Sequence, residues 1–107
     1  MQIPTATNKV SMHPVALVQE KREQILRISA AHGARNVRIF GSVARNEASD
    51  ASDIDFLVEL EPGSSLLDLG GLLVELEQLL ARRVDIVTEQ GLHWYLRDKI
   101  INEARPL

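Results

Sequence analysis

Two short apolar runs, joined by a polar stretch, constrain the fold of this chain more than any other feature of its sequence. The first run, VRIF, ends at Phe40 and is followed by Gly41-Ser42, and the second, IDFLVEL, begins at Ile54 between two aspartates. Their alternation and their β-branched residues predict strands over Asn36–Phe40 and Asp53–Leu60. A Gly-Ser turn therefore follows one predicted strand, and an Asp-x-Asp pair opens the next.

The remaining segments predict helices around a third strand. An apolar stripe after Pro14 predicts one helix of about four turns, which ends near Gly33, a residue suited to the left-handed C′ position. Ser65 and Asp68 have the spacing of a capping box before a leucine-rich helix, in which the pair Gly70-Gly71 predicts a kink or a close approach to the sheet. The other predicted elements are a first helical turn at Ser42–Arg45, a loop over Asn46–Ser52, a strand over Arg83–Thr88 and a last helix over Leu92–Ala104.

The length of the chain, 107 residues, fits one domain. Residues 1–14 mix polar residues with two prolines and show no period, so we expect a mobile N-terminal lead-in there and a single domain over residues 15–107. The strand, helix and strand from Asp53 to Thr88 predict a crossover between parallel strands. The expected fold class is therefore α/β (α+β), with a small mixed sheet of about three strands flanked by helices.

Composition excludes several classes of protein. Hydrophobic residues form 45% of the chain and charged residues 25%, which is ordinary for a globular domain. The absence of cysteine excludes disulfides and thiolate zinc sites. The net charge of -3 offers no overall attraction to a polyanion, so we expect no direct binding of nucleic acid. No apolar run approaches the roughly 20 residues that span a bilayer, so we expect no membrane segment and a cytoplasmic location.

Three aspartates form a candidate metal site. On a strand, side chains at i and i+2 point the same way, so Asp53 and Asp55 leave one face with their Cα atoms about 7 Å apart. Two carboxylates this close repel each other unless a cation lies between them, and Mg²⁺ prefers such oxygen ligands. Asp85, in the next strand, would let the site hold two ions about 3.5–4 Å apart, one at the attacking oxygen and one at the leaving pyrophosphate.

The Gly-Ser turn is a candidate phosphate site. Gly41 lets the backbone approach a phosphate, and the following helical turn presents free N–H groups with a partial positive charge. The hydroxyl of Ser42 adds a donor, and Arg45, one turn later, could pair with an oxygen of a triphosphate.

Each motif also has a purely structural interpretation. An Asp-x-Asp pair at the start of a strand can be a solvated cap, a Gly-Ser pair can be a simple turn, and Asp85 can face solvent from an edge strand. The joint occurrence of all three in strand contexts favours the functional interpretation. Trp94 and Tyr95, near the start of the last predicted helix, are assigned to packing or to contact with a partner.

The spacing of these motifs resembles a known family. Gly41-Ser42, ten residues, then Asp53-x-Asp55, with Asp85 in a later strand, is similar to the nucleotidyltransferase fold of the DNA polymerase β superfamily. More narrowly, the chain from Ile25 to Leu107, with RVDIVTE and the ending LRDKIINEARPL, resembles the minimal nucleotidyltransferase family. It departs at Asn46, where relatives usually carry glycine; asparagine tolerates the left-handed conformation better than most residues do.

The resemblance implies a set of roles. Members of this family are often antitoxins paired with a HEPN-domain RNase toxin. Gly41 and Ser42 would hold the nucleotide phosphates, and Asp53, Asp55 and Asp85 would bind Mg²⁺ and support catalysis. The implied reaction transfers AMP from ATP to a tyrosine hydroxyl of the toxin, which silences it, and the expected state is a hetero-oligomer with that toxin.

Two alternatives stay open at this stage. The protein could neutralise its partner by stable complex formation alone, with a vestigial or regulatory site. It could also transfer a nucleotide to a small molecule, as aminoglycoside nucleotidyltransferases do, although those enzymes usually need a further domain or subunit to hold the acceptor.

Overall fold

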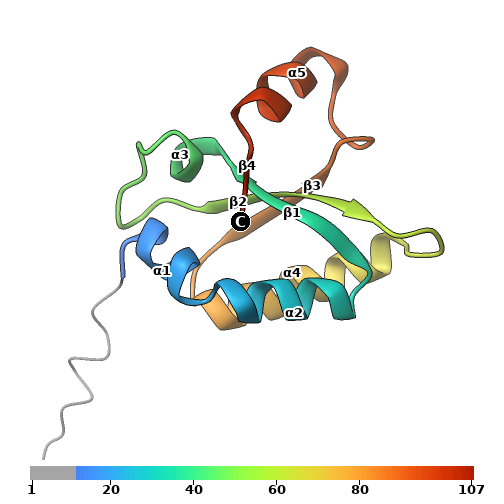
Figure 1. The fold of residues 1–107 in the computed structure, drawn as a ribbon, viewed down its shortest axis with the longest axis horizontal. Coiled ribbons are helices and arrows are strands. Elements are labelled where there is room, and N and C mark those ends of the chain that lie inside the picture. The colour runs from blue at the N-terminus through green and yellow to red at the C-terminus, as the bar shows by residue number, and fades with distance from the viewer. Residues whose placement is uncertain (1–11) are drawn as a thin grey trace, which may run out of the picture.

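A four-stranded sheet organises residues 12–107, which are the residues that the computed structural model describes (Figure 1). The strand order is β3-β2-β1-β4. The strands are β1 (Ala34–Phe40), β2 (Ile54–Leu60), β3 (Val84–Thr88) and β4 (Arg105–Pro106). The helices are α1 (Pro14–Glu20), α2 (Arg22–Ala31), α3 (Gly41–Ala44), α4 (Leu66–Leu80) and α5 (Trp94–Glu103).

The sheet is mixed, as the sequence predicted. β1 runs antiparallel to β2, and β2 runs parallel to β3 through the connecting helix α4, which confirms the expected crossover. The prediction of about three strands missed β4, which pairs antiparallel with β1. β4 has only two residues, and one is Pro106, which cannot donate to a ladder, so no periodicity could have indicated it.

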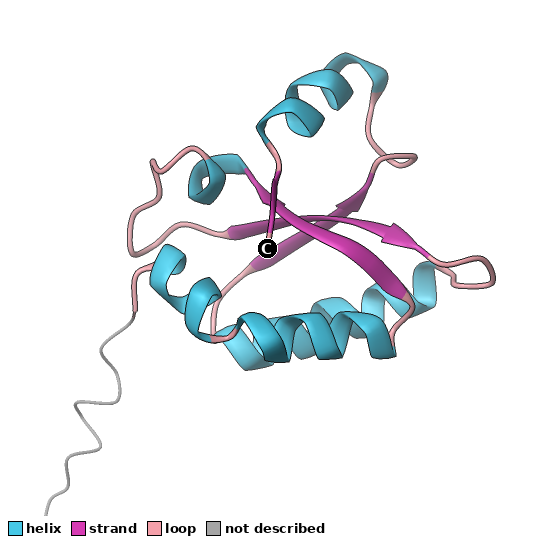
Figure 2. Ribbon diagram, viewed as in Figure 1, coloured by secondary structure: helices cyan, strands magenta, loops and turns pink. Residues whose placement is uncertain are grey.

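Helices cover the sheet unequally. α1, α2 and α4 lie along one face, whereas α5 and the short α3 lie on the other side (Figures 1 and 2). The main core is aliphatic and lies between the first face and its helices. Its buried members include Leu17, Val18, Ile25, Val37, Ile54, Phe56, Val58, Leu72, Leu76 and Leu80. α5 has no buried residue and contacts β1 and α3, so it is the least embedded of the longer helices.

The first predicted helix is broken into two. α1 and α2 meet at Lys21, whose backbone (φ -95°, ψ 10°) departs from helical values, although the N–H of Lys21 still reaches the carbonyl of Leu17 at 3.0 Å. The apolar stripe predicted a single helix because the stripe itself continues across this break. Gly33 follows with φ +76°, which confirms the left-handed position predicted for it.

The predicted lead-in over residues 1–14 lies largely outside the described residues. The described part of this segment leads into helix α1. The His13 side chain accepts a hydrogen bond from the N–H of Val15, and Pro14 is buried at the first turn of the helix.

α4 has the predicted capping box. The Ser65 side chain accepts from the N–H of Leu67 at 3.2 Å, and the N–H of Ser65 donates to Asp68 at 2.8 Å. The predicted close approach of Gly70-Gly71 to the sheet was wrong, because a Cβ on Gly71 would lie 2.9 Å from the ring of His32 and a Cβ on Gly70 would meet nothing within 4 Å. The close approach is therefore to the end of α2.

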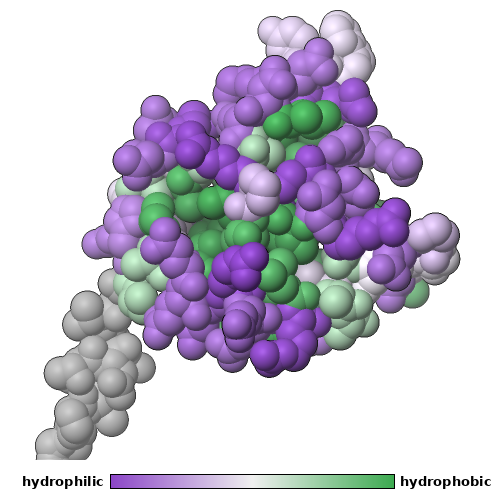
Figure 3. All heavy atoms as spheres, viewed as in Figure 1, coloured by the Kyte–Doolittle hydropathy of each residue, from purple (hydrophilic) through white to green (hydrophobic). Residues whose placement is uncertain are grey.

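The face of the molecule shown in Figure 3 is mostly hydrophilic. On the face shown in Figure 3, apolar surface appears mainly in the middle and is surrounded by hydrophilic residues. Within residues 12–107, no helix combines the length and the apolar character needed to cross a membrane.

Candidate active site

Three neighbouring strands bring the predicted site residues together. In the pairing of β1 with β2, Phe40 lies opposite Asp55, and in the parallel pairing of β2 with β3, Asp55 lies beside Asp85. Gly41, the first residue of α3, directly follows Phe40. Since neighbouring strands are about 4.8 Å apart, the register alone places the turn after β1 and the two aspartates in one row across the sheet.

The turn that follows β1 lies directly against Asp55. We call residues Gly41–Arg45, which comprise α3 and its C-cap, the Gly-Ser turn. Gly41 has φ +72°, and a Cβ built on it would lie 2.2 Å from an Oδ atom of Asp55. Only glycine fits here, because both the backbone conformation and the space exclude a side chain.

Asp55 is the most strongly perturbed carboxyl group of the site. Its pKa is raised to about 6, first by burial and then by the charges of Asp85 and Asp53, while Arg45 acts in the opposite direction. Asp55 is half-buried, whereas the other two aspartates are exposed. The carboxylates of Asp85 and Asp53 therefore both lie close enough to Asp55 to act on its pKa.

The donor set fits a hard divalent cation. Carboxylate oxygens are ligands that Mg²⁺ accepts, and a cation bound beside Asp55 would lower the pKa of this carboxyl group again. Among residues 12–107, no group of three or more acidic or histidine side chains has the geometry of a metal site. Asp53, Asp55 and Asp85 thus remain predicted ligands.

Arg45 lies at the end of the Gly-Ser turn and is held by two carboxylates. Its Nε donates to Glu47 at 2.9 Å, and its Nη1 donates to both oxygens of Glu103 at 3.2 and 3.3 Å. Asn46, the departure from the family pattern, has φ +60°, so it adopts the left-handed conformation that its side chain tolerates. Ser42 is half-buried in α3, beside Gly41.

Glu103 belongs to this site and was missed by the sequence prediction. It is the last residue of α5, and its carboxylate accepts a hydrogen bond from the N–H of Gly41 at 2.7 Å. Burial acts to raise the pKa of Glu103, but the bond from Gly41 and the guanidinium of Arg45 outweigh it, so the pKa lies below its usual value. No local pattern indicated this role, because 62 residues separate the two partners.

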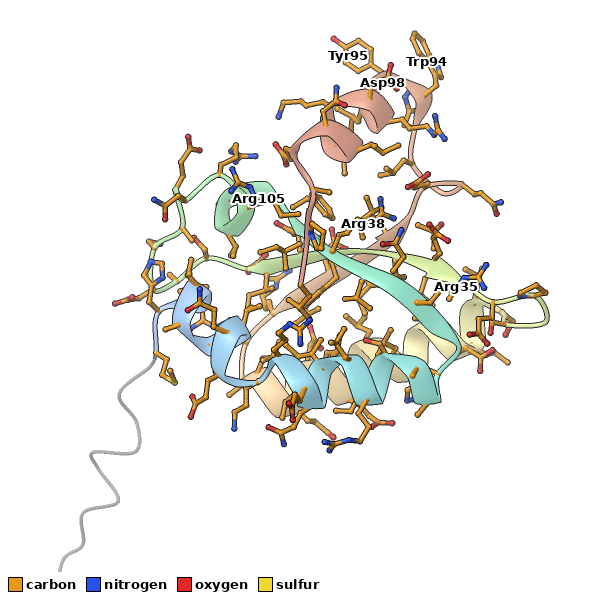
Figure 4. The ribbon with its side chains drawn as sticks, viewed as in Figure 1. Arg35, Arg38, Trp94, Tyr95, Asp98 and Arg105 are labelled. Carbon is orange, nitrogen blue, oxygen red and sulfur yellow. The ribbon has the colours of Figure 1, made fainter. Side chains whose placement is uncertain are left out.

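Two cavities within residues 12–107 lie near the sheet, and of this pair the smaller one touches the predicted site. A shallow cavity of about 160 Å³ is bounded by Asp85 and by apolar residues of α4 and β3: Leu66, Leu69, Leu73 and Ile86. A larger cavity of about 260 Å³ lies near Arg35, Glu59 and Glu89, and none of the predicted site residues lines it. Figure 4 shows Arg35 far along β1 from Arg105, which lies near α3. The smaller cavity is therefore the one relevant to the site.

Comparison with known proteins identifies the family. A family model described as a nucleotidyltransferase domain matches residues 7–107. The chain belongs to the nucleotidyltransferase domain family. A candidate protein adenylyltransferase of Methanocaldococcus jannaschii is 47% identical over 87 residues, covering 81% of this chain and 94% of that protein. Protein adenylyltransferase MntA of Thermococcus cleftensis is 37% identical over 90 residues, covering 77% of this chain and 91% of its own.

Solved structures agree with this assignment. A structure described as a minimal nucleotidyltransferase is similar with a TM-score of 0.81 and 48% identity, covering 92% of this chain and 100% of that one. A toxin–antitoxin crystal structure with AMP-PNP shares the fold at a TM-score of 0.68 and 19% identity, covering 78% of this chain and 69% of that one. The protein is a nucleotidyltransferase of the minimal type, and the predicted fold class and enzyme class are confirmed.

Proposed function

We propose that this nucleotidyltransferase transfers AMP from ATP to a tyrosine hydroxyl of a HEPN RNase toxin and so acts as its antitoxin. The observation that carries the proposal is the contact of the Gly-Ser turn with Asp55, in register with Asp85. A phosphate bound at the turn would lie beside the carboxylates. That is the juxtaposition that nucleotidyl transfer needs.

Each residue has a proposed part in the reaction. The N–H of Gly41, the hydroxyl of Ser42 and the guanidinium of Arg45 would bind and orient the β- and γ-phosphates. Asp53, Asp55 and Asp85 would hold Mg²⁺, which when bound would stabilise negative charge on the phosphates. A bond forms between the tyrosine oxygen and the α-phosphorus, the α–β phosphoanhydride bond breaks, pyrophosphate leaves, and the tyrosine proton passes to solvent.

A protein acceptor is favoured over a free small molecule. One relative is named a protein adenylyltransferase and another a candidate protein adenylyltransferase, and both match most of this chain. The cavity beside Asp85 is lined mainly by leucine and isoleucine side chains, which suit the ring of a tyrosine better than the hydroxyl-rich surface of a sugar. Transfer of a nucleotide to a small molecule such as an aminoglycoside therefore ranks last among the candidate functions.

A labelling experiment tests the reaction. The protein is incubated with Mg²⁺, the toxin candidate encoded beside it, and ATP labelled at either the α- or the γ-phosphate. Label from α-labelled ATP should enter the toxin, whereas label from γ-labelled ATP should not. Asp55→Asn should abolish the transfer, and Glu23→Gln, which removes an exposed carboxylate on α2, should leave it intact. Equal labelling by wild type and Asp55→Asn would exclude this assignment of the site.

The second candidate function, neutralisation by binding alone, is favoured by a separate observation. Trp94 and Tyr95 are 78% and 74% exposed at the start of α5, and Figure 4 shows both rings pointing away from the body of the protein. Exposed aromatic residues of this kind are frequent anchors of protein interfaces. If Asp55→Asn abolishes labelling but still protects cells from the toxin, binding is sufficient for neutralisation.

A further inference from the structure

We propose that Glu103 is a positioning residue of the Gly-Ser turn, whose carboxylate holds the Gly41 N–H and Arg45 in place and competes with the nucleotide phosphates for both. This inference rests on the proposed phosphate site and adds to it a component that lowers nucleotide affinity. It is carried by the contacts of one side chain at the end of α5.

The carboxylate of Glu103 makes the contacts that a phosphate oxygen would make. It accepts from the Gly41 N–H at 2.7 Å and from Arg45 Nη1 at 3.2 and 3.3 Å, and Lys99 Nζ lies 4.0 Å from it. Its side chain is only 15% exposed, so these contacts are made with little competition from water. An anion surrounded by a backbone donor and two cations is the environment expected for a bound phosphate.

The Glu103 carboxylate and a phosphate would compete directly for the N–H of Gly41. A backbone N–H carries one proton, so it cannot donate at full strength to a carboxylate and to a phosphate at once. Arg45 can share its donors, because a guanidinium carries five N–H groups. A triphosphate must therefore displace Glu103 from Gly41 while remaining near its negative charge. Glu103 also contributes to the raised pKa of Asp55, which places its charge within reach of the metal carboxylates.

The same contacts also support the conformation of the turn. Gly41 has φ +72° and lies against Asp55, a like-charged neighbour of Glu103, so the turn needs a partner that holds its N–H in this direction. Glu103 is that partner. The residue thus keeps the turn ready for a phosphate and limits how tightly the phosphate, including the pyrophosphate product, is held.

Two isosteric variants separate competition from simple support. Glu103→Gln removes the charge, while its amide oxygen can still accept from Gly41. Glu47→Gln is the matched control, because Glu47 pairs with the same guanidinium at 2.9 Å and is 65% exposed, whereas the Gly41 N–H donates to Glu103. The probes are inorganic tripolyphosphate in EDTA and ATP with Mg²⁺, with binding followed by calorimetry at one fixed salt concentration.

The expected result is tighter binding in one variant only. Glu103→Gln should bind tripolyphosphate about tenfold more tightly than wild type, the size of one charge-assisted hydrogen bond, and should lower KM for ATP with less change in kcat. Glu47→Gln should stay within about twofold of wild type. Equal or weaker binding by Glu103→Gln, with wild type binding normally, overturns the inference but not the proposed function. Absence of binding in all three proteins overturns both.

A measurement on the wild-type protein covers the case in which Glu103→Gln does not fold. The ¹³C resonance of the Glu103 side-chain carboxyl group should shift as tripolyphosphate saturates the protein, because the carboxylate leaves the Gly41 N–H. A resonance that stays in place while the probe binds would contradict the proposed competition.

Discussion

Replacing Asp55 by asparagine should stabilise the metal-free protein at neutral pH, although it should abolish activity. The pKa of Asp55 is raised from 3.8 to about 6 in the folded protein, first by burial and then by the charges of Asp85 and Asp53. The folded state therefore binds a proton more tightly than the unfolded chain does. Stability conferred by this group is present at low pH and is lost as the pH rises from about 4 through about 6.

The size of the stabilisation by Asp55→Asn follows from the shift in the pKa of Asp55. A difference of about 2 pKa units corresponds to about 3 kcal/mol, and partial exposure of Asp55 to solvent reduces this to about 1–2 kcal/mol in the free energy of unfolding. Asparagine carries no charge and avoids this cost. The stabilisation by Asp55→Asn should accordingly be near zero below pH 4 and reach its full value by pH 7.

Urea denaturation in EDTA at several pH values from 3.5 to 7 measures this difference as roughly 1–2 kcal/mol between Asp55→Asn and wild type. Asp98→Asn, at an exposed position, is the control and should change stability by less than about 0.5 kcal/mol at each pH. Added Mg²⁺ should stabilise wild type more than Asp55→Asn, because binding to the folded state is linked to folding. A gain of equal size at pH 3.5 and pH 7, or no gain at pH 7, would refute the proposed repulsion.

Three further predictions follow from other parts of the molecule. Gly41→Ala should lower the free energy of unfolding by about 1–3 kcal/mol and abolish nucleotide binding. Gly63 also has a positive φ but has open space around it, so Gly63→Ala should lower the stability less and leave nucleotide binding intact. Thermal unfolding measures the stability of each variant, and calorimetry measures its nucleotide binding. Ser65→Ala should destabilise the protein by about 1 kcal/mol through loss of the capping box, with unchanged labelling of the toxin. The double change Trp94→Ala with Tyr95→Ala should alter stability by less than about 0.5 kcal/mol, because both side chains are exposed, yet weaken the complex with the toxin in a pull-down titration.

Local patterns in the sequence predicted most of the elements. Alternation identified the three longer strands, the Ser65 capping box identified the start of α4, and Gly33 identified the end of α2. These signals depend on residues within a few positions of one another, which is why they could be recognised without the fold. The break at Lys21 was missed because it does not interrupt the apolar stripe. The strand β4 was missed because two residues are too few to create a period.

The chemistry of the site was also predictable in part. Gly41 and the three aspartates were selected because few residue types allow a close backbone approach or bind Mg²⁺ through oxygen. The family match then confirmed the class of enzyme that these residues suggested. Their individual roles as ligands of metal and phosphate stay predictions, and the experiments above test them.

Local sequence patterns therefore identify the strands, the glycine turn and the candidate carboxylates. Which of these residues lie next to one another depends on how the distant segments pack. The register of β1, β2 and β3 brings Gly41, Asp55 and Asp85 into one row, and the packing of α5 delivers Glu103 to the turn from 62 residues away. Strand register and helix packing are set by contacts between distant segments, so no window of the sequence contains them. That long-range packing places the carboxylate of Glu103 against the turn that we propose binds phosphate.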